Sequence, residues 1–564
     1  MGNQTSTPPL SADSISNQFI FIALCSLIGL LYVAGLPIYL MEPDAAVYAI
    51  LSKKMVQSGN YWDLYLYDKD WLDKPHFPFW ITAFSFLLFG INTIAYKLPA
   101  LLFILLAAYY TYRFAKELYS TKVARLAVLI LLTALHLIMS NSDVRAEPYL
   151  TGLVIASTYH FYRLQHKFTW KHLVAGAFYA ACAIMTKGIF TIVPIGGAIF
   201  IELLTKRQWK DIFHWKWLLV GIITLLFTAP ELYSLYHQFD MHPEKEIFGE
   251  THVSGIRFFF WDSQFGRFFN TGPIKGQGDK FFFLHTLLWA FLPWALLMYY
   301  ALIKQIKESI QKAHQEFYTI GGATITILLF SLSQFQLPHY TNIIFPFLAI
   351  FTAKEIVVIG TSKKGELFYK SAQYFTIVVL LLAPIILHYF FRPETISLWF
   401  VLAALFLIGI FVYLIKSTIH YWLKVFYYTC LSCLFFTFYL NLIFYPDVLQ
   451  YQASSEAAFY TNTHYPNTPT AVFGDLRTLS FDFYARQHVK WYFTLDEFKQ
   501  IHYTRPMIVY TTVAKLQELK NANIPYRLIK EFKGVHVTTL TGEFINHETR
   551  LQSLETSVLV LISH

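Results

Sequence analysis

Residues 67–80, YDKDWLDKPHFPFW, bring acidic and basic groups together with aromatic rings. In membrane proteins, ionisable side chains near apolar segments are costly and serve function more often than structure. Asp73 and Lys74 stand directly before Pro75, and a residue that precedes proline is largely restricted to extended backbone conformations. The Lys74 side chain is therefore expected to have a fixed direction, as a group that binds a ligand needs.

Two further segments carry ionisable groups in similar settings. EPDAAVYAI places Glu42 and Asp44 directly after an apolar run, and SNSDVRAEPY places Asp143 and Glu147 four residues apart. Residues with this spacing share one face of a helix. Positioned carboxylates of this kind are candidates for general acid–base chemistry or for binding a ligand.

The composition is that of a membrane protein with many spans. Of 564 residues, 55% are hydrophobic and only 14% are charged, and the mean hydropathy is +0.43. A soluble domain of this length needs more polar surface. The net charge of +9 is attributed to lysines near anionic lipid headgroups rather than to a nucleic-acid partner. The four cysteines all lie in apolar runs, which argues against a disulfide framework or a cysteine-based zinc site.

Apolar stretches long enough to cross a bilayer, which takes about 20 helical residues, recur through residue 445. Thirteen are predicted, at residues 19–41, 96–117, 123–140, 147–164, 171–187, 189–205, 216–236, 281–303, 318–334, 340–357, 373–391, 395–415 and 424–445. The apolar run 78–90 is too short to cross and is expected to form an interfacial helix. The predicted fold is therefore an all-α polytopic membrane protein with about thirteen transmembrane helices.

The distribution of Lys and Arg predicts which connections face the cytoplasm. Every second connection carries Lys or Arg, as cytoplasmic loops do, while the long loops 42–95 and 237–280 fall on the opposite side. This pattern predicts a cytoplasmic N-terminal tail over residues 1–18 and a transmembrane domain over 19–445. It also predicts that the C-terminus lies outside the cytoplasm.

Residues 446–564 have a different character. Short β-rich runs (PTAVFG, KWYFT, PMIVYTT, PYRLIKEF and HVTTLT) alternate with two helical ones (TLDEFKQIHY and VAKLQELKNA). This alternation predicts a small α/β domain of about 120 residues on the extracytoplasmic side.

The segment PDAAVYAILSKKMVQSGNY, followed by WLDKPHFPFWITAFSFLLFGINTIAYKLPALLF, resembles the start of the GT-C class of membrane glycosyltransferases. The nearest resemblance is to lipid A aminoarabinose transferases and to bacterial enzymes like the protein O-mannosyltransferases. Further matches follow in the same order: Glu147-Pro148, Thr186-Lys187-Gly188, Trp261 with Arg267-Phe268, Leu292-Pro293-Trp294, and Leu337-Pro338 with Tyr340 and Phe345-Pro346. The resemblance covers most of residues 40–350; each motif is weak alone, and their order makes the set specific.

The resemblance implies an inverting glycosyltransferase of the inner (plasma) membrane. Its donor would be a sugar on a polyprenyl phosphate such as undecaprenyl phosphate, and its acceptor a lipid or a protein at the outer face. Because the phosphate is the leaving group, its developing charge needs nearby cations, and Lys74, Arg267 and Lys187 are implied in this role. Asp44 is implied as the general base for a hydroxyl acceptor, or as a group that orients an acceptor that is already ionised.

The same resemblance implies the remaining residues of the site. Those expected to contact the substrates are Tyr48, Trp71, Glu147 and Tyr340. Asp73 is the expected ligand of a divalent metal ion, the one cofactor considered.

The chain also departs from the aminoarabinose transferases. Val47 stands where members of the family often have Arg, Gln264 stands where they have His, and QFQLP replaces KGKLP. These losses of basic groups weaken the expectation of a phosphate-rich lipid A acceptor, and the loss of the His weakens a metal site.

Two other functions remain open on the sequence. A transporter or lipid flippase would also have many spans, but such proteins usually carry inverted repeats and helices that are broken at the midplane. An O-antigen-type ligase would share the compartment and the lipid donors but would take a diphosphate-linked glycan. The sugar, the acceptor and the role of the C-terminal domain are left open, and the chain is expected to act as a monomer.

Overall fold

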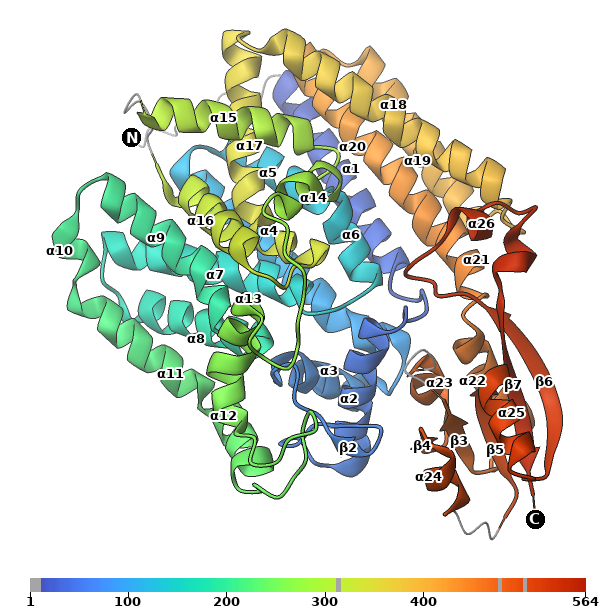
Figure 1. Ribbon diagram of the computed structural model, residues 1–564. Helices are drawn as coiled ribbons and strands as arrows, with labels where there is room; N and C mark the ends of the chain where they lie inside the picture. The colour runs from blue at the N-terminus through green and yellow to red at the C-terminus, as the bar shows by residue number, and fades with distance from the viewer. Residues whose placement is uncertain (1–11, 311–315, 475–478, 501–504, 564) are drawn as a thin grey trace, which may run out of the picture.

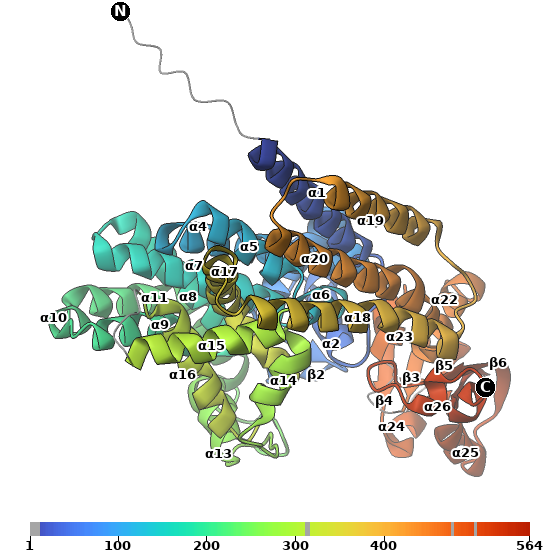
Figure 2. The same ribbon diagram turned by 90° about the horizontal axis from the view of Figure 1, so that it is seen from above.

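The computed structural model describes residues 12–310, 316–474, 479–500 and 505–563. Helices make up most of the molecule, and a small sheet domain stands at one end of it (Figure 1). The view from above shows the long helices α18 (Glu366–Phe391), α19 (Leu398–Lys416) and α20 (Tyr421–Tyr439) running together toward that domain (Figure 2). Most of the predicted tail 1–18 lies outside the described residues, and the first helix begins at Ala12.

The first half of the chain forms a series of helices with one short hairpin. Its elements are α1 (Ala12–Ala34), α2 (Asp44–Ser58), β1 (Tyr65–Leu66), β2 (Lys69–Asp70), α3 (Phe77–Phe89), α4 (Thr93–Leu118), α5 (Thr121–Leu132), α6 (Leu135–Ser142), α7 (Glu147–His166), α8 (Trp170–Lys187), η1 (Ile189–Thr191), α9 (Ile192–Thr205), α10 (Trp209–Ile212), α11 (Trp215–Leu235) and η2 (Tyr236–Asp240).

Shorter elements then alternate with long helices up to the sheet domain. They are α12 (Gly255–Arg257), the π-helix η3 (Phe258–Gly266), α13 (Arg267–Phe269), α14 (Phe282–Ala290), α15 (Ala295–Ile310), α16 (Tyr318–Leu332), η4 (Pro338–Ile344), α17 (Phe345–Ser362), then α18, α19 and α20, and finally η5 (Leu440–Phe444) and α21 (Tyr445–Leu449).

All thirteen predicted apolar stretches overlap helices, although the first, 19–41, runs past the end of α1 at Ala34 into non-helical chain. By length and composition, seven helices among the described residues can cross a membrane, or eight if one bent pair counts as a single span. The short run 78–90 forms α3, which has 13 residues. At 1.5 Å per residue α3 is about 20 Å long, less than the roughly 30 Å of a bilayer core.

Two predicted spans are broken, and the breaks lie against each other. α5 and α6 meet at an angle of 51°, and the predicted span 281–303 is divided into α14 and α15 around Pro293. The Leu135 N–H donates to the Leu292 carbonyl at 2.8 Å, and the Trp294 Nε1–H donates to Thr133 Oγ1 at 2.9 Å. The first bond pairs a backbone group at one break with a backbone group at the other, as a broken helix inside a membrane requires, and the second joins side chains beside the breaks.

The helices α4 and α7 approach each other closely beside the site. A Cβ added at Gly152 in α7 would come within 2.4 Å of the Phe103 carbonyl oxygen in α4. Small residues at such crossings allow two backbones to pack directly. This packing fixes the start of α7, where Glu147 stands.

The C-terminal sheet has five strands in the order β4-β3-β5-β7-β6. The strands and helices of this domain are α22 (Ala453–His464), β3 (Thr470–Phe473), α23 (Leu479–Tyr484), β4 (Val489–Tyr492), α24 (Leu495–Lys499), β5 (Met507–Thr512), α25 (Val513–Asn521), β6 (Tyr526–Gly534), α26 (Gly542–Ile545), η7 (Arg550–Ser553) and β7 (Glu555–Ile562). β3 pairs in parallel with β4 and β5, while β7 is antiparallel to both β5 and β6.

One predicted strand of this domain is wrong. HVTTLT, residues 536–541, is a turn that follows β6, and the strand beside β6 is instead β7, with the sequence ETSVLVLI. β7 pairs with a neighbour along both edges, so its backbone N–H and C=O groups have partners on both sides.

Candidate active site

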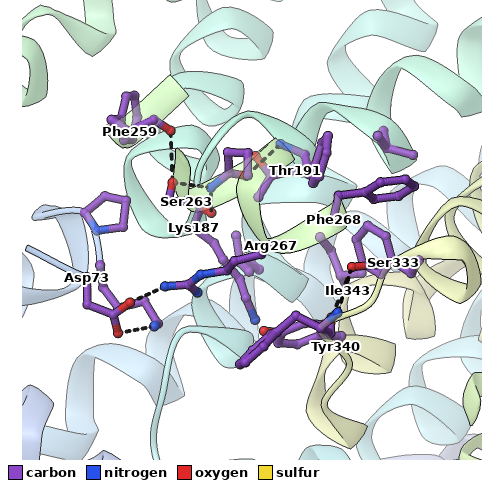
Figure 3. Close-up of a pocket in the computed structure, with 18 of the residues that line it drawn as sticks. Asp73, Lys187, Thr191, Phe259, Ser263, Arg267, Phe268, Ser333, Tyr340 and Ile343 are labelled. Carbon is purple, nitrogen blue, oxygen red and sulfur yellow. Dashed lines mark hydrogen bonds and ion pairs between the residues drawn. The ribbon is translucent and has the colours of Figure 1, made fainter. Parts of the chain in front are cut away.

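The nine residues singled out in the sequence line one cavity of about 440 Å³, called the chamber below. They come from α2, the segment after β2, α7, α8, α13 and η4: Asp44, Tyr48, Trp71, Asp73, Lys74, Glu147, Lys187, Arg267 and Tyr340. Figure 3, a close-up of the smaller pocket that adjoins the chamber, shows Asp73, Arg267 and Tyr340 pointing into the space between them from separate segments of the chain. The chamber therefore collects groups from positions up to about 300 residues apart in the sequence.

Asp73 holds two cations at the edge of the chamber. The Lys74 Nζ lies 2.5 Å from one carboxylate oxygen, and the Arg267 guanidinium donates to the other (Figure 3). Burial would raise the pKa of the Asp73 carboxyl, but the charges of Lys74 and Arg267 outweigh burial and keep the pKa below its ordinary value. The Arg267 Nε is buried and has no hydrogen-bond partner among the described residues, so the contact with Asp73 leaves part of the donor capacity of this guanidinium unused.

The Asp73-Lys74 segment is held by a buried pair that follows it. The His76 backbone N–H donates to one oxygen of Glu231 at 2.9 Å, and the His76 Nδ1 lies 3.0 Å from the other oxygen. Glu231 belongs to α11, and both side chains are almost fully buried. This pair fastens the start of α3 to α11 and so fixes the turn that presents Lys74.

Arg267 stands directly after the π-helix η3. π-Helical turns are rare and occur mostly at functional sites. The hydrogen bonds from the backbone N–H groups of Thr271 and Gly272 to the Gly266 carbonyl fold the chain back at this point. The guanidinium also lies over the Phe335 ring, 5.4 Å from its centroid, a contact that further restricts its orientation.

Lys187 is the last residue of α8 and forms a second charged group with Glu147. Its Nζ donates to a Glu147 carboxylate oxygen and lies 3.6 Å from the centroid of the Tyr340 ring. The His339 Nε2 approaches the same carboxylate at 3.7 Å. Glu147 is buried, so its charge requires these partners.

A glycine and a glutamine shape the turn that carries Lys187. Gly188 has φ +98°, and a Cβ there would come within 2.2 Å of the Gln264 amide. That amide donates to the Lys187 carbonyl at 3.2 Å. Gln264, which stands where aminoarabinose transferases have His, thus holds the backbone on which Lys187 is mounted.

Asp44, the first residue of α2, faces Arg145, which the sequence analysis missed. The Arg145 Nη1 lies 2.6 Å from Asp44 Oδ2, and its Nη2 lies 2.7 Å from Asp143 Oδ2. Burial would lower the pKa of Arg145, but the charges of Asp143 and Asp44 raise it above its ordinary value. The side chain of Asp44 is half exposed, in contrast to the buried Glu147, so it is the carboxylate of the chamber most accessible to a ligand.

Aromatic rings form the wall between Asp44 and Lys74. Tyr48 and Trp71 both contact Phe79 of α3, with ring centroids 5.1 and 5.9 Å apart. The backbone N–H of Trp71 donates to the Leu64 carbonyl at 2.9 Å, which ties this residue to the β1–β2 hairpin.

A second, mostly apolar space of about 130 Å³ adjoins the chamber and is called the side pocket below. It shares with the chamber Asp73, Lys74, Glu147, Lys187, Arg267, Phe335 and Tyr340. The rest of its lining is largely apolar and includes Leu150, Phe190, Phe259, Phe268 and Phe330. The cations therefore stand where a polar chamber meets an apolar pocket.

The chamber residues do not fit a divalent metal ion. Among the described residues, no group of three or more His, Cys, Asp or Glu side chains is suited to hold one. Each oxygen of Asp73 already faces a cation, and a metal there would compete with Lys74 and Arg267 for the same carboxylate. The predicted metal at Asp73 is therefore not confirmed.

Comparisons with known proteins bear on these observations. A family model described as dolichyl-phosphate-mannose-protein mannosyltransferase matches residues 73–233. An undecaprenyl phosphate-alpha-4-amino-4-deoxy-L-arabinose arabinosyl transferase from Erwinia tasmaniensis is 28% identical over 341 residues, which cover 58% of this chain and 57% of the relative. A protein of the same name from Edwardsiella ictaluri is 26% identical over 340 residues, 59% of this chain and 58% of the relative. The matched region thus spans somewhat more than half the length of these relatives.

The structural similarity extends over almost the whole chain. The crystal structure of ArnT from Cupriavidus metallidurans bound to undecaprenyl phosphate superimposes with a TM-score of 0.74, at 18% identity, over 97% of this chain and 98% of that one. The shared fold therefore includes the C-terminal sheet domain as well as the helices. Together, the family model, the arabinosyl transferases and the shared fold confirm that this chain resembles the GT-C glycosyltransferases of the aminoarabinose transferase type.

Proposed function

We propose that this protein is an inverting glycosyltransferase that moves a sugar from a polyprenyl-phosphate donor to a lipid or protein acceptor at the outer face of the inner membrane. The observation that carries the proposal is the convergence of Lys74, Arg267 and Lys187 at the junction of the chamber and the side pocket. A polyprenyl phosphate sugar has a polar head, an anionic centre and an apolar tail, in that order. The chamber, the cations and the side pocket follow the same order.

The names of the similar proteins support this donor. The arabinosyl transferases are named for a sugar carried on undecaprenyl phosphate, and the ArnT structure is described as bound to undecaprenyl phosphate. In this chain the donor phosphate would lie against Arg267, whose Nε is unpaired, with Lys74 and Lys187 beside it.

In the proposed reaction the bond between the sugar C1 and the phosphate oxygen breaks while an acceptor oxygen attacks C1 from the opposite face. The electron pair of the broken bond stays on the phosphate, and the three cations stabilise the added negative charge. For a hydroxyl acceptor, Asp44 takes the proton; for a phosphate acceptor, which is already ionised, Asp44 orients the attacking group. Tyr48, Trp71, Glu147 and Tyr340 would then shape the space for the sugar. No step requires a metal ion.

The charge distribution does not favour the transporter alternative. The ionisable groups of the chamber stand at the ends of α2, α7 and α8 and in connecting segments, rather than along the middle of broken helices. Transporters place their coupling sites near the midplane.

We further propose a thirteen-span arrangement with α3 at the interface and the chamber on the extracytoplasmic side. In it the tail 1–18 is cytoplasmic, residues 19–445 form the catalytic domain and residues 446–564 lie outside as a separate domain. The extracytoplasmic loops would be 42–95 and 237–280. The enzyme would act as a monomer.

The proposal is tested by comparing cells that lack the protein with cells that express the wild type or Asp44→Asn. Mass spectrometry of membrane glycolipids and glycoproteins is expected to show that one sugar modification is lost with the protein. Wild type should restore that modification and the variant should not. If no glycolipid or glycoprotein loses a sugar, or if the variant restores the sugar fully, the assignment is wrong.

A further inference from the structure

Two buried charges at α2 do not face the chamber and are not used in the proposed reaction. Glu42 precedes α2 by two residues, and Lys53 lies in its third turn; their exposed fractions are 7% and 4%. A buried charge is costly unless it is paired or hydrogen-bonded. The groups that pair with Glu42 and Lys53 therefore indicate which part of the structure these two charges stabilise.

The partners of both charges lie in the C-terminal domain, most of them on the short helix α23; Ser454 belongs to α22, and Ala485 directly follows α23. The Glu42 carboxylate accepts from the backbone N–H of Ser480, in the first turn of α23, and from Ser454 Oγ at 2.8 Å. The Lys53 Nζ donates to the carbonyls of Asp482, Phe483 and Ala485 at 2.5, 3.1 and 2.9 Å.

Backbone N–H groups at a helix start and carbonyls at a helix end have no partner within the helix. Glu42 satisfies one such N–H, and Lys53 satisfies three carbonyls at the other end. α2 and α23 are therefore joined at two points, one near each end of α23, and Figure 1 shows the two helices side by side.

This joint lies directly behind the chamber wall that carries Asp44. Leu479, the first residue of α23, lines the chamber together with Asp44 and Tyr48 of α2. The C-terminal domain also touches the β1–β2 hairpin through Tyr67 and Trp491, whose ring centroids are 4.6 Å apart. The wall that carries the acidic group is thus built on both domains.

We propose that α23 of the C-terminal domain positions the Asp44 wall of the active site, with Glu42 and Lys53 as the positioning residues. This inference rests on the proposed glycosyl transfer. Lys187 and Arg267 come from α8 and α13, which the joint does not touch, and the turn that presents Lys74 is fastened to α11 by the His76–Glu231 pair. Loss of the joint should therefore lower turnover and leave the affinity for the donor phosphate intact. A displacement of about 1 Å at a reacting group can cost about 100-fold in rate.

The main variant is Lys53→Met, which keeps an unbranched side chain out to the ε position and removes the ammonium. Lys424→Met is the matched control, because the Lys424 Nζ also donates to backbone carbonyls, those of Ile415 and Ser417, but between α19 and α20. We expect K53M to lower kcat by about 10-fold or more while the Kd for undecaprenyl phosphate stays within about 2-fold. K424M should change neither. A K53M protein with wild-type kcat, or with a Kd that rises in proportion to the fall in kcat, would overturn the inference.

A second pair of variants covers the case in which K53M does not fold, as judged by loss of a cooperative thermal unfolding transition. Glu42→Gln retains an oxygen that accepts from Ser480 and Ser454, whereas Glu42→Leu does not. We expect E42Q to retain most of the turnover that E42L loses; equal turnover in the two would refute the positioning role.

Hydrogen–deuterium exchange of residues 44–58 separates this inference from the proposed function. Faster exchange in K53M than in wild type, with no change in α8, is expected whether or not the sugar donor is correctly assigned. If wild type transfers no sugar but exchange in α2 still responds to K53M, the proposed function fails and the joint stands. If wild type transfers sugar and neither exchange nor kcat responds to K53M, the joint fails and the proposed function stands.

Discussion

Two cavities of similar volume lie among the helices, and they differ in chemistry. The chamber measures about 440 Å³, and a second space of about 510 Å³, called the groove below, lies between α8, α9 and α11. The chamber is lined by paired carboxylates and cations. The groove is lined by apolar side chains such as Ile195, Phe200 and Trp217, with Thr224 and Thr228 as its hydroxyls.

The difference shows that volume alone does not identify a site in a membrane protein. An apolar groove among helices is filled by lipid chains at little cost, whereas buried charges are stable only with partners. The side pocket lies on the other face of the same segment, since Phe190 and Thr191 line it while Ile189 and Ile192 line the groove. This short segment of chain therefore separates the charged site from the apolar groove.

The largest effect is expected for Asp44→Asn, which removes the accessible carboxylate of the chamber. If Asp44 takes the proton of a hydroxyl acceptor, kcat should fall about 100-fold or more, while undecaprenyl phosphate should bind as it does to wild type. Asp68→Asn is the matched control, because its carboxylate is 48% exposed and 2.7 Å from Lys54, against 50% and 2.6 Å for Asp44 and Arg145. Equal losses in both variants, measured as initial transfer rates, would contradict the role of Asp44.

The next effect is expected for Arg267→Met, which removes the guanidinium that donates to Asp73 where the chamber meets the side pocket. Loss of one donor to a developing anion typically costs about 100-fold in rate, and the donor should also bind less tightly. Arg257→Met serves as the control, because Arg257 lies at the other end of the π-helix η3, is 74% exposed and lies 3.6 Å from Asp262. Turnover and donor binding should fall in R267M and stay unchanged in R257M. If they fall in R257M and stay unchanged in R267M, the donor phosphate does not bind at Arg267.

A moderate effect is expected at Tyr340, whose ring lies under the Lys187 ammonium. Tyr340→Leu removes the ring and should weaken donor binding by about 10-fold, the size of a well-buried cation–π contact. Tyr340→Phe keeps the ring and should bind the donor within about 2-fold of wild type. If the two variants bind undecaprenyl phosphate equally, the ring contact does not hold Lys187.

A small effect is expected in the groove. Ile195→Val removes one methylene from its lining and should cost about 0.5–1.5 kcal/mol of stability, with transfer activity within about 2-fold of wild type. Thermal unfolding and initial rates on the same preparation check both values. A large loss of activity without a loss of stability would make the groove part of the active site.

The smallest effect is expected from the titration of Asp73. The pKa of the Asp73 carboxyl is lower in the folded protein than its ordinary value of about 4. The ionised carboxylate therefore stabilises the fold at pH values above about 4. This stabilisation is lost as the pH falls through the lower pKa of the folded state. The difference in apparent unfolding temperature between wild type and Asp73→Asn should be constant from about pH 5 to 8 and shrink below about pH 4. A difference that declines between about pH 5 and 8 would contradict the paired state of Asp73.

The contents of the chamber were predicted from the sequence in two ways. Asp44, Asp73, Lys74 and Glu147 stand out as ionisable groups in an apolar chain, whereas the other five residues were implied by the resemblance to the GT-C glycosyltransferases. All nine predicted residues line it, although their roles remain predictions. Arg145 was missed because the sequence shows a basic residue between Asp143 and Glu147 but does not show which way its side chain points. That direction depends on the turn between α6 and α7, which brings the guanidinium to Asp44.

Other errors share the same physical origin. The breaks in the predicted spans 123–140 and 281–303 are stabilised by each other, through Leu135 with Leu292 and Thr133 with Trp294. Neither segment alone carries that information, because each reads as a continuous apolar run. In the C-terminal domain, residues 536–541 and β7 have similar β-propensity, and only the position between β5 and β6 decides which becomes a strand.

The central claim is that the cations of the chamber recognise the phosphate of a polyprenyl donor. It is tested most directly by measuring the binding of undecaprenyl phosphate and of undecaprenol, which has the same chain and no phosphate, to wild type and to Arg267→Met. Wild type should bind the phosphate at least about 10-fold more tightly than the alcohol, and the variant should lose most of that preference. Equal binding of the two lipids by wild type, or an undiminished preference in the variant, would contradict the account.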